Sequence, residues 1–177
     1  MGSRLLEGLE QAEEKLDSEL DRLERMDEDE IERLRNERMD QLRRNHRQKE
    51  EWIRQGHGEY REVTETKEFF QELKKSKRAV VHFYRPATWR CEIVDRHLLR
   101  LAPQHLETKF VKVNAEKHPF LAERLKIWML PTVVLVVSGK TEHSIVGFDE
   151  LGGDEFTTEQ LESVFLQHDV VWESFCE

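Results

Sequence analysis

Hydrophobic residues in the N-terminal part of the chain recur with the period of a helix. Between Leu5 and Gln55 the apolar side chains are spaced three, four or seven residues apart in an otherwise charged sequence without proline. Acids that precede bases by four residues, such as Asp29 before Arg33, each add about 0.2–0.5 kcal/mol to an isolated helix. This pattern predicts helix rather than strand. Its narrow apolar seam consists of Leu16, Leu20, Leu23, Ile31, Leu34 and Leu42.

Two short stretches mark where this helical region changes. Near Met26, Asp27 can cap a new helix while Glu30 reaches back to it, which predicts two helices or one kinked helix. Gly56 and Gly58 are typical of the glycines that end a helix in left-handed geometry. We therefore expect a charged helical region over residues 1–58, a folded domain over 59–170 and a tail over 171–177.

From Tyr60 onward the pattern changes to short alternating elements. Helices are predicted at Val63–Lys75, Cys91–Leu101 and Pro119–Leu125, and after Thr157. Strands are predicted at Ala79–Tyr84, Phe110–Asn114, Thr132–Val137 and Thr141–Val146. Because Ser138-Gly139 is a tight-turn signal, the last two strands should form a hairpin. The order predicts an α/β fold, a central mixed sheet flanked by helices.

Three of these elements support more detailed predictions. The helix after Val63 should bury Phe69, Phe70 and Leu73 on one face. The run from Thr132 to Val137 is continuously apolar and β-branched, which is typical of a central strand covered on both faces. Thr157 should cap the last helix, with Gln160 in the reciprocal position.

Composition narrows the classes of function. The net charge of -9 argues against non-specific nucleic-acid binding and favours basic partner surfaces. The charged fraction of 37% equals the hydrophobic one, which indicates a long solvated element. Cys91 and Cys176 are the only cysteines, and the eight histidines are scattered, so neither a disulfide framework nor a metal site is indicated. No cofactor motif is present. With no long apolar run, we expect a soluble, cytoplasmic protein without a membrane segment.

The segment from Val80 to Val94 resembles the active-site region of thioredoxins. That family has an apolar strand, then Trp-Cys-Gly-Pro-Cys, then a helix, and here the corresponding turn is Thr88-Trp89-Arg90-Cys91. The first, attacking cysteine falls on Thr88 and the second on Cys91, while His82 takes the place of a buried carboxylate. The resemblance thus implies a thioredoxin-like fold without dithiol catalysis, because threonine cannot form a disulfide. Thr88 is then interpreted as a helix-capping hydroxyl and Cys91 as a small buried side chain.

A second thioredoxin feature is the loop at Leu130-Pro131-Thr132. It matches the family's cis-proline loop, which lies opposite the cysteine turn and borders a groove for extended peptides. The resemblance implies that Trp89, Leu130 and Pro131 form a binding groove. Retention of the groove without the attacking thiol favours binding over catalysis.

Several motifs resemble the phosducin-like proteins of the third class more specifically. They are the charged N-terminal helix, the Thr-Trp-Arg-Cys turn, Gly56-His57-Gly58-Glu59-Tyr60 and Gly147-Phe148-Asp149-Glu150-Leu151. The resemblance spans about Met26 to Leu166. It implies a non-enzymatic co-chaperone that binds the cytosolic chaperonin and modulates the folding of its clients, tubulin and actin. It also implies a cytoplasmic location, with nuclear or centrosomal sites in addition.

Two other hypotheses stay open on the residues themselves. A one-cysteine redox protein would use Cys91 as its thiol. A structural coiled coil would use the leucine seam of the N-terminal helices to form a homodimer.

Overall fold

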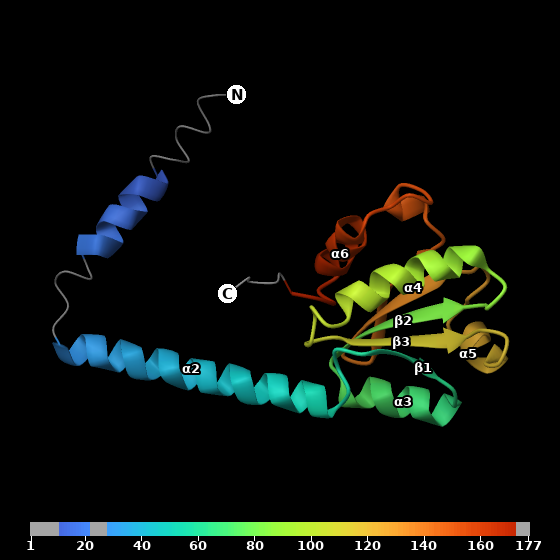
Figure 1. Ribbon diagram of the computed structural model, residues 1–177, viewed down its shortest axis with the longest axis horizontal. Helices are drawn as coiled ribbons and strands as arrows, with labels where there is room; N and C mark the ends of the chain where they lie inside the picture. The colour runs from blue at the N-terminus through green and yellow to red at the C-terminus, as the bar shows by residue number, and fades with distance from the viewer. Residues whose placement is uncertain (1–10, 22–27, 173–177) are drawn as a thin grey trace. The chain divides into compact units, whose positions relative to one another are not determined.

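The computed structural model describes residues 11–21 and 28–172. The chain divides into two compact units, Met1–Arg47 and Gln48–Glu177, each of which is treated separately. Figure 1 shows the helices of the first unit and the sheet and helices of the second. None of the described helices is both long and apolar enough to cross a membrane.

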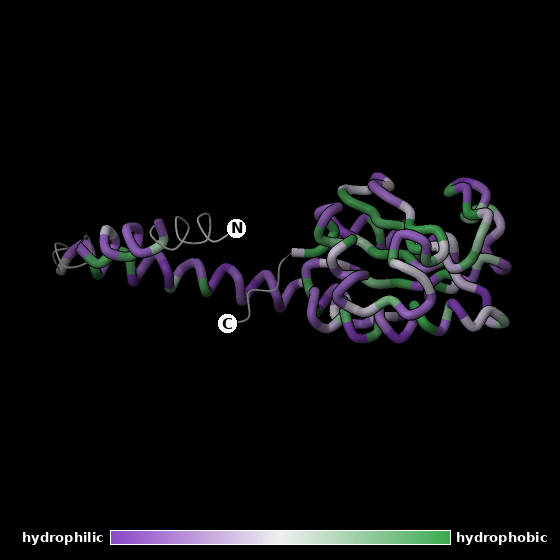
Figure 2. Tube along the Cα trace, turned by 90° about the horizontal axis from the view of Figure 1, so that it is seen from above, coloured by the Kyte–Doolittle hydropathy of each residue, from purple (hydrophilic) through white to green (hydrophobic). Residues whose placement is uncertain are grey.

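The first unit is helical, as the leucine spacing predicted. A helix occupies residues 11–21, and α2 runs over Glu28–Arg54 and extends into the second unit. The predicted cap at Asp27 and the seam residue Leu23 lie outside the described residues. The rest of the seam is exposed, and Figure 2 shows α2 mostly in hydrophilic colours with isolated hydrophobic positions. The exposed seam residues are Leu16, Leu20, Ile31, Leu34 and Leu42.

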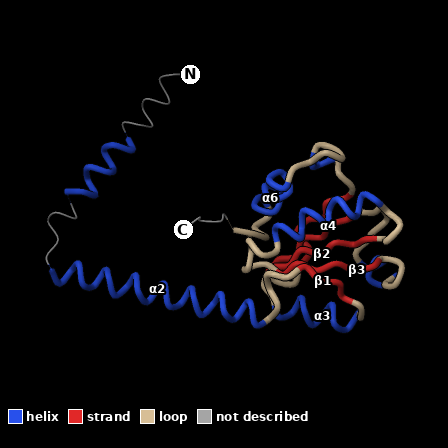
Figure 3. Tube along the Cα trace, viewed as in Figure 1, coloured by secondary structure: helices blue, strands red, loops and turns tan. Residues whose placement is uncertain are grey.

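The second unit contains a five-stranded mixed sheet in the order β1-β3-β2-β4-β5 (Figure 3). β1, β3 and β2 are parallel, whereas β4 is antiparallel to both β2 and β5. The strands are β1 Tyr60–Val63, β2 Arg78–Tyr84, β3 Lys109–Asn114, β4 Thr132–Val137 and β5 Lys140–Val146. The helices are α3 Thr66–Lys75, α4 Trp89–Leu101, α5 Pro119–Arg124 and α6 Thr158–Gln167, with a 3-10 turn, η1, at Asp149–Leu151.

Most of the predicted elements are confirmed. The β4–β5 hairpin forms, and every residue of β4 except Val137 is buried. Thr157 and Gln160 form the reciprocal capping box at the start of α6, with Gln160 N donating to Thr157 Oγ1 at 3.3 Å. Gly56 and Gly58 both have positive φ, as a left-handed helix ending requires.

The strand β1 was missed. Val63 was expected to open a helix, but it ends a four-residue parallel strand, and α3 begins only at Thr66. So short a segment has almost no periodic signal, and its backbone donors and acceptors are paired by β3. The neighbouring strand, rather than local propensity, decides its conformation.

The buried face of α3 also differs from expectation. Phe69 is buried, but Phe70 is 40% exposed, so the prediction that Phe70 lies on the buried face is wrong. Glu72 is buried instead, because Lys109 Nζ lies 3.1 Å from Glu72 Oε2 and Arg61 Nη2 lies 2.8 Å from the same oxygen. An ion pair of good geometry makes a buried carboxylate tolerable.

The sheet has a hydrophobic core on each face. α4 and α6 pack on one face through Val94, Leu98, Leu161 and Phe165, whereas α3 and α5 pack on the other. Each fully buried Leu, Val or Phe side chain contributes about 1.5–3 kcal/mol relative to exposure. The two cores hold the β2–α4 turn and the α5–β4 loop in position.

Candidate functional site

The turn between β2 and α4 keeps its backbone geometry without the attacking thiol. Thr88 N donates to the carbonyl of Arg85 at 3.1 Å, and Cys91 N donates to the carbonyl of Thr88 at 3.0 Å. Thr88 stands at the N-cap of α4, but its hydroxyl makes no capping hydrogen bond. The interpretation of Thr88 as a capping hydroxyl is therefore wrong, and only its backbone takes part in starting the helix.

Cys91 is shielded in the first turn of α4. Its side chain is 2% exposed, and burial raises the pKa of the thiol, as does the nearby Asp95 carboxylate. Less thiolate forms at neutral pH as a result, and reagents do not reach the sulfur. This environment is the opposite of the electropositive, accessible setting of a reactive cysteine.

The two middle residues of the turn face solvent. Trp89 is 59% exposed, and the Arg90 guanidinium lies 5.6 Å from the centre of its ring. Arg90 Nε also lies 2.9 Å from Asp154 Oδ1, which ties the turn to the segment before α6. Trp89 is thus presented as an exposed aromatic surface.

The α5–β4 loop lies opposite this turn. The Leu130–Pro131 peptide bond is cis, as the resemblance implied. A pocket of about 530 Å³ lies between the loop and the turn. Thr88 and Leu130 both line it, whereas Trp89 and Pro131 flank these two residues in the chain. The lining residues are Arg85, Thr88, Ala115, Glu116, Pro119, Ala122, Glu123, Ile127, Trp128 and Leu130.

Exposed apolar residues occur in and next to the chain segments that line this pocket. Trp128 is 78% exposed, and Phe120 and Met129 are also exposed. Together with Trp89, which follows the lining residue Thr88, we call this set of exposed residues the aromatic rim: Trp89, Phe120, Trp128 and Met129. Sequence reasoning singled out only Trp89 from this set, although aromatic residues and Met in the segment just before a cis-proline loop were an available signal.

A partly buried polar network next to α4, centred on the buried His82, was missed in the sequence. His82 Nδ1 lies 3.0 Å from Asp95 Oδ1, and the Tyr60 hydroxyl donates to the same oxygen at 2.5 Å. Lys112 Nζ donates to Asp95 Oδ2 at 3.0 Å. Asp95 therefore supplies from α4 the carboxylate that His82 displaces from β2. The available signal was the spacing of Cys91 and Asp95, which are four residues apart and so share one helix face.

The partners of Asp95 in this network stabilise its negative charge. Burial raises the pKa of Asp95, but hydrogen bonds from His82, Tyr60 and Lys112 outweigh it and lower the pKa to about 2. Burial lowers the pKa of His82, so that its ring is neutral, and it raises the pKa of Tyr60 together with the adjacent Asp95 charge. The carboxylate stays ionised and fully paired. With so low a pKa it is a weak base toward a thiol near neutral pH.

Among residues 11–21 and 28–172, no three His, Cys, Asp or Glu side chains gather closely enough to hold a metal ion. The buried histidines instead have protein partners. His57, for example, donates from Nδ1 to the Leu106 carbonyl and accepts at Nε2 from the Ser76 hydroxyl, both at 2.7 Å.

Comparisons with known proteins agree with this fold. The thioredoxin family model matches residues 61–153. Thioredoxin domain-containing protein 9 from Bos taurus is 59% identical over 90% of this chain and 71% of its own length, and the Homo sapiens protein is 54% identical over the same shares. Phosducin-like protein 3 from Drosophila melanogaster is 48% identical over 85% of this chain and 70% of its own length.

Solved structures show the same fold. A mutant thioredoxin from Halobacterium salinarum is 18% identical, with a TM-score of 0.54 over 63% of this chain and 91% of its own. Mitochondrial thioredoxin 3 from Saccharomyces cerevisiae is 23% identical, with a TM-score of 0.52 over 61% of this chain and 94% of its own. The chain belongs to the family of thioredoxin domain-containing protein 9, a group of phosducin-like proteins built on the thioredoxin fold.

Proposed function

We propose that this chain is a non-enzymatic co-chaperone that binds the cytosolic chaperonin and its clients, tubulin and actin, in the cytoplasm. The observation that carries the proposal is the turn at the start of α4. Thr88 replaces the attacking thiol there, and the remaining thiol of Cys91 is 2% exposed. A thioredoxin-like groove that cannot attack a disulfide is suited to holding a protein segment. Family membership supports the same proposal.

The aromatic rim offers the contact surface that such a role needs. Trp89 and Trp128 are large and exposed; Trp128 lines the pocket, and Trp89 follows the lining residue Thr88 in the chain. Exposed aromatic side chains and Met are enriched at the centres of protein interfaces, where a few anchors carry most of the binding energy. The pocket next to them can receive one apolar side chain of a partner.

The leucine seam of the first unit is a second candidate contact surface. The helix at 11–21 and α2 each expose apolar residues at helical spacing, among them Leu16 and Leu34. An amphipathic helix of this kind binds in a groove of a partner through anchors at three- and four-residue spacing. Since the chain is acidic, the partner surface around that groove is expected to be basic.

The first experiment is capture of the cytosolic chaperonin from a cell extract by the full chain and by a fragment that begins at Gln48. The compact second unit starts there, so the fragment keeps the sheet, the groove and the end of α2. We expect the full chain to capture chaperonin and the fragment to capture less. The absence of chaperonin from both samples would refute the proposal.

The second experiment tests the groove directly. Trp128→Ala should weaken chaperonin or client capture by about 1 kcal/mol or more, because it removes an interface anchor. Leu99→Ala is the matched control, since Leu99 is 57% exposed on α4 and outside the pocket lining. Equal losses from the two variants would show that the rim has no special part in binding.

A homodimer is the second candidate, because the seam is exposed in a single chain. It predicts a doubled mass in light scattering that returns to the monomer value in a Leu34→Glu, Leu42→Glu variant. A monomer mass at all concentrations would refute the homodimer, and the seam would then be expected to bind a different protein.

A further inference from the structure

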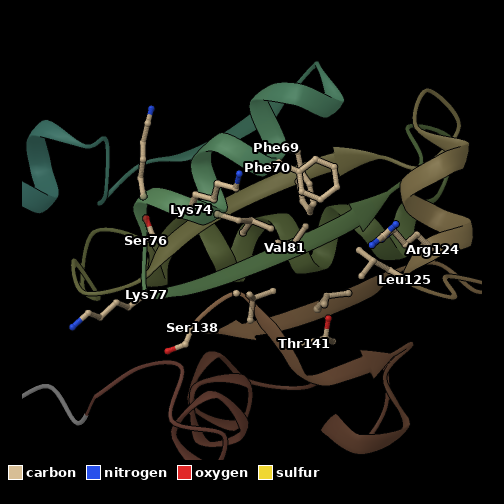
Figure 4. Close-up of a pocket in the computed structure, with 15 residues that line it drawn as sticks. Phe69, Phe70, Lys74, Ser76, Lys77, Val81, Arg124, Leu125, Ser138 and Thr141 are labelled. Atoms are coloured by element: carbon tan, nitrogen blue, oxygen red, sulfur yellow. The ribbon is translucent and has the colours of Figure 1, made fainter.

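The second unit has a larger groove that is remote from the cysteine turn. It has a volume of about 850 Å³ and lies on the sheet face shared by α3 and α5, whereas α4 and Cys91 belong to the opposite face. Figure 4 shows it between α3, the β4–β5 hairpin and the end of α5. Its apolar floor consists of Phe69, Phe70, Leu73, Val81, Leu125, Val134 and Val136.

The groove exists because α5 is short. α5 spans only the six residues Pro119–Arg124, so it covers one end of this face and leaves the rest of it open. Phe70, 40% exposed on α3, forms one side of the opening and packs edge-on against Phe69 at 5.4 Å. A large apolar side chain exposed beside a groove is a feature of docking surfaces.

The groove is also locally basic in an acidic chain. Four of its lining residues are cations and none is an acid, although the whole chain has a net charge of -9. Lys75 is 3.1 Å from Glu72, and no ion pair is formed by the other three with any described residue. In Figure 4, Lys77 lies at one end of the groove and Arg124 at the opposite end. The cations are Lys74, Lys75, Lys77 and Arg124.

We propose that this groove is a docking site for an acidic segment of a partner protein, with a short apolar centre flanked by carboxylates on both sides. The apolar floor would take the central side chains, and the cations at the two ends would pair with the flanking acids. A fatty acid or other single-headed amphiphile is disfavoured, because it carries charge at one end only. No residue that lines this groove also lines the pocket beside the cysteine turn, so this proposal does not depend on chaperonin binding.

The test uses the full chain and a short fluorescent peptide, in which leucine and phenylalanine are flanked on each side by glutamates. A second peptide has glutamine in place of every glutamate. We expect fluorescence anisotropy to show roughly tenfold tighter binding of the acidic peptide at low salt. The difference should shrink at high salt, since the Debye length falls from about 10 Å at 0.1 M to about 3 Å at 1 M.

Variants then locate the binding site. Lys77→Glu combined with Arg124→Glu should weaken binding of the acidic peptide by roughly tenfold or more, and Phe70→Ala should weaken both peptides. Lys67→Glu is the matched control for charge, because Lys67 is exposed on α3 but outside the groove. Thermal unfolding of each variant checks that the fold is kept.

Three results would overturn the proposal. They are equal binding of the two peptides, an equal loss from Lys67→Glu, and full displacement of the acidic peptide by decanoate at matched concentration. The last would show that the groove takes a single-headed amphiphile instead.

Discussion

At position 88 the difference between a hydroxyl and a thiol determines which chemistry the turn can perform. A thiolate at a helix N-terminus attacks disulfides, whereas a threonine hydroxyl stays protonated and inert at neutral pH. Burial works against the same role for Cys91, because it raises the thiol pKa and shields the sulfur. The Asp95 carboxylate next to it is already paired with His82, Tyr60 and Lys112.

The one-cysteine redox hypothesis is tested at this residue. In a Cys176→Ser variant, which leaves Cys91 as the single thiol, native protein should react with iodoacetamide on the order of tenfold or more slowly than urea-unfolded protein near neutral pH. Burial and the raised thiol pKa are the reasons. A native Cys91 that reacts as fast as the unfolded one would restore the redox hypothesis.

His105 is a second residue whose environment changes its chemistry. It is 1% exposed and lies between Glu107 Oε1 at 3.0 Å and Glu162 Oε1 at 3.2 Å. Burial lowers the pKa of the imidazole, but the two carboxylates outweigh burial and raise it above 6.5. Glu107 also accepts from Trp172 N, so the charged histidine joins α6 to the C-terminal segment.

This arrangement predicts a pH-dependent contribution to stability. A histidine with a raised folded pKa stabilises the protein fully below its unfolded value of 6.5, and the contribution is lost as pH rises through the folded pKa. Urea unfolding of His105→Gln should show a loss of about 1.5–3 kcal/mol at pH 6 that becomes smaller toward pH 9. In Glu162→Gln the pH dependence should be weaker, because one carboxylate is gone. A loss that is the same at all pH values would show that His105 is neutral in the fold.

At the scale of elements, the end of α2 is held by a buried lysine. Lys109 Nζ, on β3, donates to the carbonyls of Gln55 at 2.9 Å and Gly56 at 2.7 Å, and it pairs with Glu72 on α3. The last carbonyls of a helix have no partner within the helix, and a cation is favoured there. One side chain thus joins the helix end to β3 and α3.

Removing this cation should lower the stability of the fold. Lys109→Met leaves Glu72 and two carbonyls buried without it, and we expect a loss of about 3–5 kcal/mol in the free energy of unfolding. Hydrogen exchange should also speed up over residues 50–57. Lys112→Met on the same strand is the control, since its ion pair with Asp95 is 26% exposed on the lysine side and does not touch α2. Equal exchange at the end of α2 in both variants would contradict the anchoring role.

Elements marked by their own turn or capping residues were predictable from the sequence. Features that depend on contacts with distant segments of the chain were not. The hairpin of β4 and β5 and the cap at Thr157 were correct, because turn and capping chemistry acts within a few residues. β1 and the burial of Glu72 depend on β3 and Lys109, which are far away in sequence. No local pattern contains that information.

At the scale of the molecule, the compact second unit begins before the glycines at 56 and 58. Trp52 stacks on His57 at 6.4 Å and meets Trp172 edge-on at 5.9 Å, so the last turns of α2 pack against this unit. The expected domain start at residue 59 would remove those contacts. The first unit, in contrast, contributes nothing to either hydrophobic core among the described residues.

Two fragments test this organisation. A fragment that starts at Gln48 should unfold cooperatively with a free energy close to that of the full chain, because both cores are complete within it. A fragment that starts at Glu59 should be less stable by about 2 kcal/mol or more, since Lys109 loses two carbonyl acceptors and Ser76 loses His57. Denaturant unfolding followed by tryptophan fluorescence measures both. Equal stability would show that the end of α2 is dispensable.

The sequence by itself determined the α/β element order, the absence of an attacking thiol and the helical seam, because each depends on residue type and short-range spacing. Through resemblance it also pointed to Trp89, Leu130 and Pro131 as groove residues, of which Leu130 lines the pocket. Only the tertiary structure decided that Asp95 replaces the carboxylate displaced by His82, that Lys109 anchors α2, and that cations gather around a second groove. Those features join side chains from different elements, and their free energy depends on burial and distance, which exist only once the chain has folded.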